Sequence, residues 1–323
     1  MINMVSIILP CYNGAKFIKR CFDCVLKQTY KNLEVILVND GSTDNSEEII
    51  NSMKYKFEEQ SMKFIYVYQK NRGLGGAINT GLKYVTGEYL TLLDIDDYIM
   101  PESIELKVQF LETNKSFDIV RTNGYYVNEN NLDDTSKLFI NNDNEKCKID
   151  IFDDLVEAKT NNWAGSYMVR TSKLFKFYED RNIYESRCGQ NLQILMPLAY
   201  NGKCGYIDKP LMKYIRQDSS LSQVGNLDFE IKNYQGYKDI RLHMIDLVVK
   251  EAEKEKYNKR VNMLYARTFM NLAIQYGNKN VLEENYNILK KNKSLTIEDK
   301  ITYYNQKNKL IAIAYRILRR ISF

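Results

Sequence analysis

The sequence predicts an α/β fold with a mostly parallel, Rossmann-like central sheet and flanking helices, followed by a helical C-terminal region. In residues 1–122, short runs rich in β-branched and aromatic residues alternate with segments of helical periodicity, which is the order of a parallel sheet. From about residue 228 onward, long Lys- and Glu-rich segments carry Leu, Ile and Met at helical spacing. We therefore expect residues 1–224 to form one domain and residues 225–323 to form a second, helical region.

The expected elements of the first domain alternate along the chain. Strands are predicted at 5–9, where Pro10 ends the run, and at 34–38, 64–68, 89–93 and 118–122. Helices are predicted at 16–28, at 45–59 with Asp44 as N-cap, at 77–85 after a glycine-rich stretch at 71–76, and from a start near Pro101. Residues 123–165 are expected to be irregular, with an exposed loop over 128–145, and mixed structure follows at 166–216.

Composition excludes several classes of protein. Hydrophobic residues make up 44% of the 323-residue chain and charged residues 27%, so the chain can bury a core and is not dominated by disorder. No apolar run approaches the roughly 18 residues of a membrane span, and the N-terminus lacks the pattern of a signal peptide, so we expect a cytoplasmic protein. The single histidine, His243, excludes most zinc enzymes, and the Cys21-x-x-Cys24 pair favours a reduced, structural role.

The net charge of +5 is concentrated at the C-terminus. Residues 301–323 hold five lysines and arginines and no acidic residue, so in the rest of the chain 41 basic residues balance 41 acidic ones. This balance argues against nucleic acid as a partner. In residues 307–323, apolar residues share one side of a helical projection and basic residues the other. The pattern fits either peripheral contact with the inner face of the cell membrane or a terminal helix docked on the body.

Three carboxylates follow the fourth predicted strand. Asp94, Asp96 and Asp97 lie within four residues, and like charges this close repel one another unless a cation neutralises them. Mg²⁺ or Mn²⁺ takes one or two carboxylates and leaves positions open for phosphate oxygens. The alternative is an acidic helix N-terminus before Pro101, which the helix dipole would favour.

Polar clusters also follow the other predicted strands. They comprise Pro10, Tyr12 and Asn13 after the first strand, Asp40, Gly41 and Ser42 after the second, and Asn71, Arg72 and Gly73 after the third. In parallel sheets, ligands bind beyond the carboxyl ends of the strands, so we expect these clusters to meet in one crevice. Each cluster alone is as compatible with an ordinary turn as with a binding site.

Together, the order and spacing of the four clusters resemble those of a family 2 glycosyltransferase of the GT-A fold, of the bacterial surface-polysaccharide or cell-wall type. The match runs from Pro10-x-Tyr12-Asn13, through 38–44 and Asn71-x-Gly73 with Asn79, to 87–101. It is close over residues 4–112 and looser to 216. The resemblance implies metal-assisted transfer of a sugar, with inversion, from a UDP-sugar donor to a hydroxyl of a glycan or lipid-linked acceptor.

The resemblance also implies roles for individual residues. Pro10, Tyr12 and Asp40 would hold the nucleobase and ribose, and Asp94 would contact the ribose and the metal. The remaining residues implied at the donor site are Asn13, Gly41, Ser42, Asn71, Arg72, Gly73 and Asn79. Asp96 would bind the Mn²⁺ or Mg²⁺ that bridges the diphosphate, and Asp97 would be a catalytic residue close to the donor sugar or the metal.

Two positions depart from the family pattern. Ile78 stands before Asn79, where relatives often have Arg, and Arg72 is the substitute cation we expect for the diphosphate. Gln190 and Asn191 stand where many relatives carry an acidic pair whose second member is the general base, and amides cannot accept a proton at neutral pH.

We therefore expect Glu185 to act as the general base, although an exposed loop acid is an equal alternative. Trp163, Gln190 and Asn191 are expected to line the acceptor or donor-sugar pocket. A catalytically silent protein or partner subunit that only binds a nucleotide sugar is the second functional hypothesis, because the usual base is missing.

Overall fold

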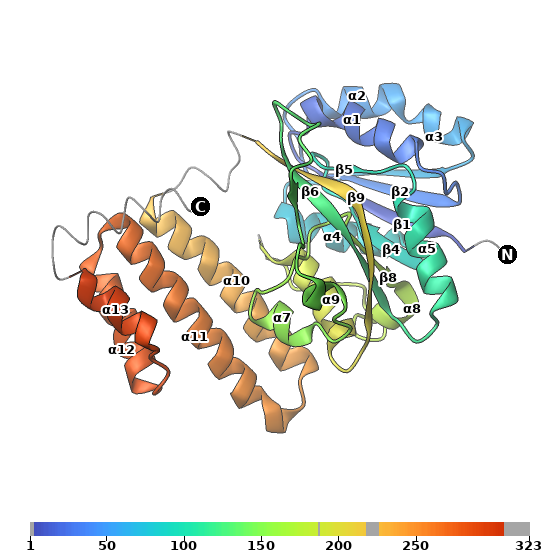
Figure 1. Cartoon of the computed structure of the whole chain (residues 1–323). Helices are drawn as coiled ribbons and strands as arrows, with labels where there is room; N and C mark the ends of the chain where they lie inside the picture. The colour runs from blue at the N-terminus through green and yellow to red at the C-terminus, as the bar shows by residue number, and fades with distance from the viewer. Residues whose placement is uncertain (1–2, 187, 218–225, 307–323) are drawn as a thin grey trace. The chain divides into compact units, whose positions relative to one another are not determined.

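The computed structural model describes residues 3–186, 188–217 and 226–306 (Figure 1). The chain divides into two compact units, residues 1–220 and 221–323. The boundary expected between residues 224 and 225 lies outside the described residues and stays a prediction. Each unit is therefore described by itself.

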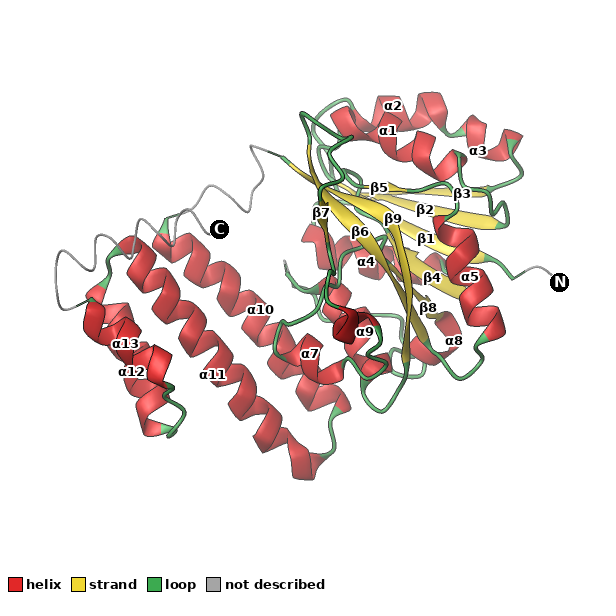
Figure 2. Cartoon of the chain, viewed as in Figure 1, coloured by secondary structure: helices red, strands yellow, loops and turns green. Residues whose placement is uncertain are grey.

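The first half of the sheet in the N-terminal unit is parallel (Figure 2). Its strands are β1 (Val5–Cys11), β2 (Leu33–Asn39), β3 (Lys63–Tyr68) and β4 (Tyr89–Leu92), in the order β3-β2-β1-β4. Every residue of β1, β2 and β4 is buried, as expected for parallel strands covered on both faces. Strand β1 continues through Pro10, which the sequence analysis wrongly took as its end. Beyond Ile8, β1 has β2 as its one paired neighbour, so a proline costs little there.

The second half of the sheet is mixed. β8 (Tyr167–Arg170) pairs antiparallel with β4 and with β6 (Ile119–Asn128), and β6 pairs in parallel with β9 (Cys204–Arg216). Two short strands complete the sheet, β5 (Tyr98–Ile99) on β9 and β7 (Lys137–Leu138) on β6. The irregular structure predicted from residue 123 is wrong for 123–128, because that segment extends β6 by pairing with a strand about eighty residues later in the sequence.

Nine helices flank the sheet within the described part of this unit. They are α1 (Ala15–Leu26), α2 (Ser46–Met53), α3 (Tyr55–Glu59), α4 (Gly73–Tyr84), α5 (Ser103–Thr113), α6 (Asp143–Lys146), α7 (Phe152–Val156), α8 (Thr171–Leu174) and α9 (Gln190–Ala199). The single helix predicted at 45–59 is two helices, and the prediction of Asp44 as its N-cap is wrong, because Asn45 is the N-cap residue of α2. The helix predicted at 77–85 begins earlier, at Gly73. The glycines of 73–76 therefore form its first turn. Glycine is needed at 75 because a Cβ there would lie 2.7 Å from the carbonyl oxygen of Ser186.

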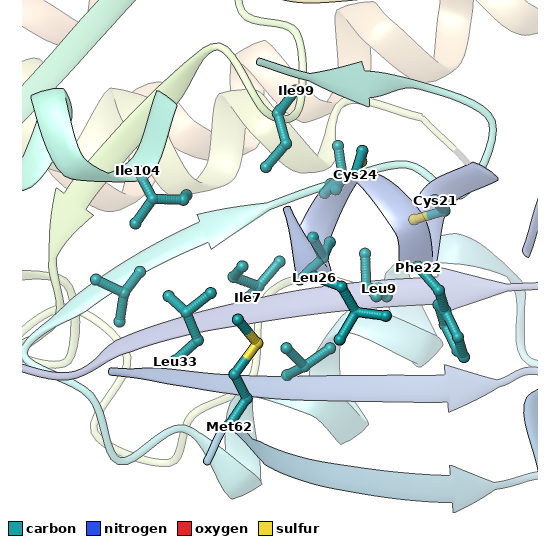
Figure 3. Packing of buried hydrophobic residues seen from close by; sticks show 14 of the residues in the cluster. Ile7, Leu9, Cys21, Phe22, Cys24, Leu26, Leu33, Met62, Ile99 and Ile104 are labelled. Carbon is teal, nitrogen blue, oxygen red and sulfur yellow. The ribbon is translucent and has the colours of Figure 1, made fainter. Parts of the chain in front are cut away.

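Alternate residues of β1 point to opposite faces of the sheet. Ile7 and Leu9 join a hydrophobic cluster with Cys21 and Phe22 of α1 (Figure 3). On the other face, Gly81 of α4 lies against Ile8, and a Cβ at Gly81 would lie 2.7 Å from a methyl carbon of that side chain. Helices α1 and α4 therefore cover the two faces of β1.

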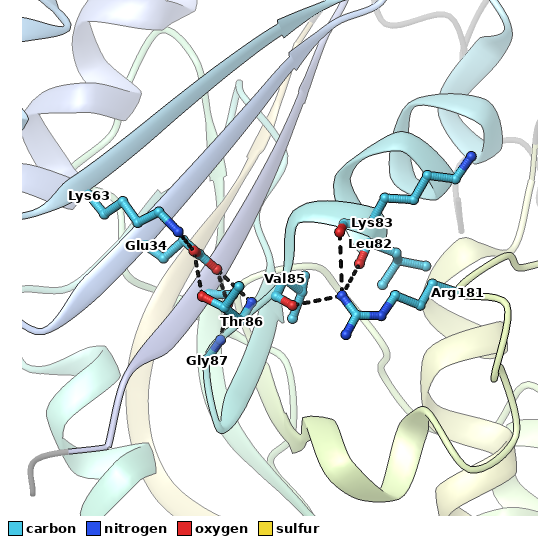
Figure 4. Close-up of polar contacts among 9 residues, drawn as sticks. Glu34, Lys63, Leu82, Lys83, Val85, Thr86, Gly87 and Arg181 are labelled. Atoms are coloured by element: carbon cyan, nitrogen blue, oxygen red, sulfur yellow. Dashed lines mark hydrogen bonds and ion pairs between the residues drawn. The ribbon is translucent and has the colours of Figure 1, made fainter.

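One buried carboxylate links three strands and a turn at the amino end of the sheet (Figure 4). Glu34 of β2 is fully buried and accepts hydrogen bonds from Ser6 Oγ at 2.7 Å, Thr86 N at 2.8 Å, Thr86 Oγ1 at 2.7 Å and Lys63 Nζ at 2.5 Å. Burial by itself raises the pKa of Glu34, but the Lys63 ammonium and the other three donors outweigh it and lower that pKa.

We expect Glu34→Ala to lower the free energy of unfolding of this unit by about 3 kcal/mol, because four donors lose their acceptor. Since the folded-state pKa of Glu34 lies below its unfolded value, its stabilisation is present above roughly pH 4.3 and is lost as the pH falls through the lowered value. Urea unfolding followed by the fluorescence of Trp163, the one tryptophan in the chain, measures both effects. The exposed Glu58→Ala is the control, and equal losses in the two variants would contradict this assignment.

The C-terminal unit is helical in its described part, which confirms the prediction made for the chain beyond residue 228. Its helices are α10 (Leu227–Val248), α11 (Glu251–Tyr276), α12 (Lys279–Lys291) and α13 (Ile297–Asn305). Helix α11 packs against both α10 and α12, and residues of α11 and α12 form a separate hydrophobic core. No helix among the described residues is long and apolar enough to cross a membrane. The basic segment 307–323 lies outside the described residues.

Candidate functional site

The loops after β1 and β2 are joined by hydrogen bonds. Asn13 N donates to Ser42 Oγ at 3.0 Å, Thr43 N donates to Asn13 Oδ1 at 2.8 Å, and Ala15 N donates to Asp44 Oδ2 at 3.0 Å. Asn13 adopts a left-handed conformation with φ 49°, which asparagine tolerates better than most residues. The structure therefore brings the first two predicted clusters together at the carboxyl end of the sheet.

Asp40 connects these loops to the one after β3. It is buried, and its Oδ1 accepts from Gln69 Nε2 at 2.7 Å and from Arg72 N at 2.8 Å. Gly41 has φ 73°, and a Cβ there would lie 2.8 Å from the backbone nitrogen of Asn71, so the close approach of the two loops requires glycine. Asn71 in turn accepts from Gly73 N through its Oδ1 at 3.1 Å. One oxygen of Asp40 thus holds the third cluster in place.

The β1 loop also presents an aromatic ring to solvent. Tyr12 is 52% exposed and directly follows Cys11, the last residue of the buried strand β1. An exposed ring beside a buried carboxylate offers a stacking face and a hydrogen-bond acceptor together, which are the two features that bind a planar base.

The acidic cluster lies directly after β4, and each carboxylate has a different environment. Asp97 is buried; its Oδ1 accepts from Ile215 N at 3.0 Å, whereas its Oδ2 has no hydrogen-bond partner among the described residues. Asp96 Oδ2 accepts from Gln217 Nε2 at 2.7 Å. Two of the three carboxylates are therefore held by hydrogen bonds, Asp97 from β9 and Asp96 from the residue that follows β9.

The cluster concentrates negative charge where solvent is scarce. Burial, with the neighbouring Asp96 charge, raises the pKa of Asp94 to about 7. Burial and the charges of Asp96 and Asp94 raise the pKa of Asp97 well above its ordinary value, and burial raises that of Asp96. Among the described residues, no lysine or arginine forms an ion pair with these carboxylates; Arg20 Nη2 reaches only the backbone oxygen of Asp96, at 2.5 Å.

This arrangement fits a divalent cation held by a small number of carboxylates. The carboxylate oxygens are hard donors, and a cation would offset the repulsion among the three side chains; next to the two expected ligands, Asp97 keeps a buried oxygen without a hydrogen-bond partner among the described residues. No three acidic, histidine or cysteine side chains converge as a ready-made metal site within the part of the chain that the structure describes. A cation bound by Asp94 and Asp96 would thus keep positions for other oxygen ligands.

Arg72 and Glu185 form an ion pair across the start of α4. Their side chains are 47% and 45% exposed, so both remain accessible to a ligand. The pair unites two residues that the sequence analysis assigned to different tasks, Arg72 to the diphosphate and Glu185 to proton removal. Gly75 packs against the backbone of Ser186, which keeps the segment carrying Glu185 close to α4.

Asn79 lies deeper than expected. It is 3% exposed, its Nδ2 donates to Ile183 O at 2.9 Å, and its Oδ1 accepts from Ile183 N at 2.7 Å. Both polar atoms of the amide are therefore used by the backbone. In place of the predicted nucleotide contact, we propose that Asn79 positions the segment that leads to Glu185.

The three residues expected in the sugar or acceptor pocket occupy separate places. Trp163 belongs to an aromatic group: its Nε1 donates to Tyr126 Oη at 3.1 Å, and its ring centroid lies 4.4 Å from that of Tyr214. Gln190 is buried and donates to the carbonyl of Ser186 at 2.9 Å.

Asn191 Oδ1 accepts from the hydroxyl of Tyr167 at 2.7 Å, and burial, together with the charge of Asp94, raises the pKa of that tyrosine. Asn191 is thereby linked to the acidic cluster through Tyr167, whereas Gln190 supports the segment that carries Glu185.

Sequence reasoning missed two residues that support the site. Gln217 contacts Asp96 because the pairing of β5 with β9 brings residue 217 beside residue 96. No sequence motif predicts that pairing. Gln69 shares Asp40 Oδ1 with the backbone of Arg72. The position of Gln69 directly after the third strand was the one feature of the sequence that could have indicated its role in the site.

Residues 6–215 match the family model described as Glycosyl transferase family 2. The chain belongs to this family. The resemblance stated from the four clusters is therefore confirmed at the level of the family.

Curated relatives share the N-terminal part of the chain. Glycosyltransferase GlyA of Streptococcus pneumoniae serotype 4 is 31% identical over 231 residues, which are 69% of this chain and 32% of GlyA. Glycosyltransferase GlyG of the same organism is 32% identical over 181 residues, 54% of this chain and 58% of GlyG. Chondroitin synthase of Pasteurella multocida is 38% identical over 127 residues, 39% of this chain and 13% of the synthase. The chain spans about a third of the length of GlyA.

Solved structures share the fold. S. aureus TarS 1–349 in complex with UDP-GlcNAc has a TM-score of 0.58 at 19% identity, covering 94% of this chain and 79% of that one. The mannosyltransferase PcManGT from Pyrobaculum calidifontis, in complex with GDP-Man and Mn²⁺, has a TM-score of 0.55 at 15% identity, covering 97% and 86%. These likenesses confirm the predicted fold class.

Proposed function

We propose that this protein transfers a sugar from a UDP-sugar donor to a hydroxyl group of a glycan or lipid-linked acceptor, in the synthesis of a bacterial polysaccharide or cell-wall glycan. The observation that carries the proposal is the acidic cluster at the end of β4, whose carboxylates form no ion pair within the described residues, together with the joined loops after β1, β2 and β3. Family membership and neighbours solved with UDP-GlcNAc and GDP-Man support it.

The joined loops would bind the nucleotide. The exposed ring of Tyr12 stacks on the uracil, and the Oδ2 of Asp40 accepts a hydrogen bond from the imide N–H, because Oδ1 is already taken by Gln69 and Arg72. Asp94 accepts from a ribose hydroxyl. The guanidinium of Arg72 turns from Glu185 to the diphosphate, for which a planar cation is well suited.

Asp96 and Asp94 would hold a Mn²⁺ or Mg²⁺ ion, and the hydrogen bond from Gln217 orients the Asp96 carboxylate for this task. When bound, the ion stabilises the charge that develops on the departing diphosphate. The mannosyltransferase neighbour solved with Mn²⁺ supports a divalent cation.

Proton removal would fall to Glu185. The acceptor hydroxyl loses its proton to the carboxylate, its oxygen forms a bond to the anomeric carbon with inversion, and the bond between that carbon and the diphosphate breaks. The amides of Gln190 and Asn191 are unable to take the proton. Because these amides occupy the usual place of the base, a protein that binds the nucleotide sugar without turnover is the second candidate function.

The basic composition of residues 307–323 supports a contact with the membrane as part of the proposal. Its five basic residues would attract this segment to an anionic membrane surface, where each basic residue contributes about 1 kcal/mol. A lipid-linked acceptor would be available at the cytoplasmic face of such a membrane.

Turnover separates the two candidate functions. The protein is mixed with Mn²⁺ and each of UDP-glucose, UDP-galactose, UDP-GlcNAc and UDP-GalNAc, and both the melting temperature and the release of UDP are measured. We expect one donor to raise the melting temperature most and to release UDP above the enzyme-free rate. A rise in melting temperature without UDP release from any donor would identify a binder instead.

A further inference from the structure

The C-terminal unit contains a groove of about 710 Å³ bounded by α10, α11 and α12, which lie side by side in Figure 1. Each helix contributes residues one turn apart. They include Ile231 and Gln235 from α10, Asn258 and Asn262 from α11, and Asn285 and Ile288 from α12. The volume falls within the range of small-molecule binding pockets. Nothing assigned so far to the protein uses this groove.

Amide side chains dominate the polar lining of the groove. They come from all three helices and are Gln235, Asn258, Asn262, Asn285 and Asn292. The charged side chains of the lining are two lysines and two glutamates, so their formal charges cancel. The rest of the lining is apolar and consists of Ile231, Met263, Ala266, Phe269, Val281 and Ile288. The groove therefore suits a neutral ligand with many hydrogen-bonding groups and some apolar surface.

Two of these amides are held in place by their own helix. Asn285 is 6% exposed and its Nδ2 donates to Val281 O at 2.8 Å, and Asn292 Nδ2 donates to Ile288 O at 2.9 Å. Asn258 Oδ1 is buried without a hydrogen-bond partner among the described residues, and a buried acceptor of this kind is costly unless a donor reaches it. Asn285 and Asn292 therefore present oriented acceptor oxygens, and Asn258 Oδ1 can accept a hydrogen bond from a ligand.

We propose that this groove binds a neutral oligosaccharide, the acceptor chain of the reaction, so the inference rests on the proposed function and deepens it. Sugar hydroxyls both donate and accept hydrogen bonds, as amides do, and the C–H faces of sugar rings pack on apolar side chains such as Phe269. An amphipathic protein helix fits less well, because it needs a continuous apolar floor and amides from every flanking helix interrupt this one.

Ligand-observed NMR titration of the full chain with cellotetraose, chitotetraose and maltotetraose, without nucleotide or divalent cation, tests the inference. We expect at least one tetrasaccharide to bind saturably. The double variant Gln235→Ala, Asn262→Ala should weaken that binding at least tenfold, because two hydrogen-bonding side chains of the lining, one from α10 and one from α11, are removed. Asn287→Ala, an exposed amide of α12 outside the groove, is the matched control and should bind like the wild type.

Three outcomes would overturn the inference: no binding of any tetrasaccharide, equal affinities for the wild type and the double variant, or equal weakening in the double variant and in Asn287→Ala. A peptide of residues 307–323 that binds the groove while no tetrasaccharide does would assign the groove to that segment of the chain instead. Two variants test the groove and the donor site independently. Asp96→Asn should keep tetrasaccharide binding while transfer is lost, and the double variant should keep the stabilisation by UDP and Mn²⁺.

Discussion

Asp96→Asn is expected to abolish the Mn²⁺-dependent stabilisation by UDP and to lower the transfer rate by about 10³-fold or more. The neutral amide cannot supply the charge that a divalent cation needs. Thermal unfolding with UDP, with and without Mn²⁺, measures the first effect, and UDP release measures the second. Asp143→Asn, an exposed aspartate of α6, is the control.

The same substitution should raise the melting temperature of the protein in the absence of metal and nucleotide. Asp96 is one of the charges that raise the pKa values of Asp94 and Asp97, so its removal relieves repulsion in the cluster. Loss of function in a more stable variant cannot be attributed to unfolding. If UDP binds the variant as tightly as the wild type and with the same response to Mn²⁺, the assignment of Asp96 is wrong.

Glu185→Gln is expected to lower turnover by 10²- to 10⁴-fold at saturating donor while the affinity for UDP changes by less than about threefold. The glutamine keeps the shape of the side chain but cannot accept the acceptor's proton. The affinity changes little because the ion pair between Glu185 and Arg72 is half exposed, and such pairs contribute little free energy. Initial rates and UDP binding, measured on the same preparations, separate the two effects.

Arg72→Met is the companion variant. It removes the other member of the ion pair, so it should weaken UDP binding while turnover at saturating donor is largely kept. Turnover of Glu185→Gln equal to that of the wild type would remove Glu185 from the mechanism and leave it as a partner of Arg72 only. If Glu185→Gln and Arg72→Met both weaken UDP binding strongly and neither changes turnover, Glu185 is likewise only a partner of Arg72.

Much of the site was predictable because it is local in the sequence. Buried β-rich runs end in polar residues at 10–13, 39–42 and 94–97, and the parallel order of the strands brings those ends to one edge of the sheet. The close approach between Gly41 and Asn71 explains why glycine stands at that position of the motif. Short-range periodicity likewise predicted the helices of the C-terminal unit.

The sequence by itself determined the fold class, the family and the convergence of the four clusters, because each depends on residues that are near one another along the chain. The tertiary structure decided where distant segments meet. It extends β6 through residues 123–128 by pairing with β9. It also forms the hydrogen bonds between the Asn79 side chain and the backbone of Ile183, and the one between Gln217 and Asp96. These contacts join residues from about 80 to 120 positions apart, and no local pattern specifies such a pairing, because its free energy depends on the packing of the whole sheet.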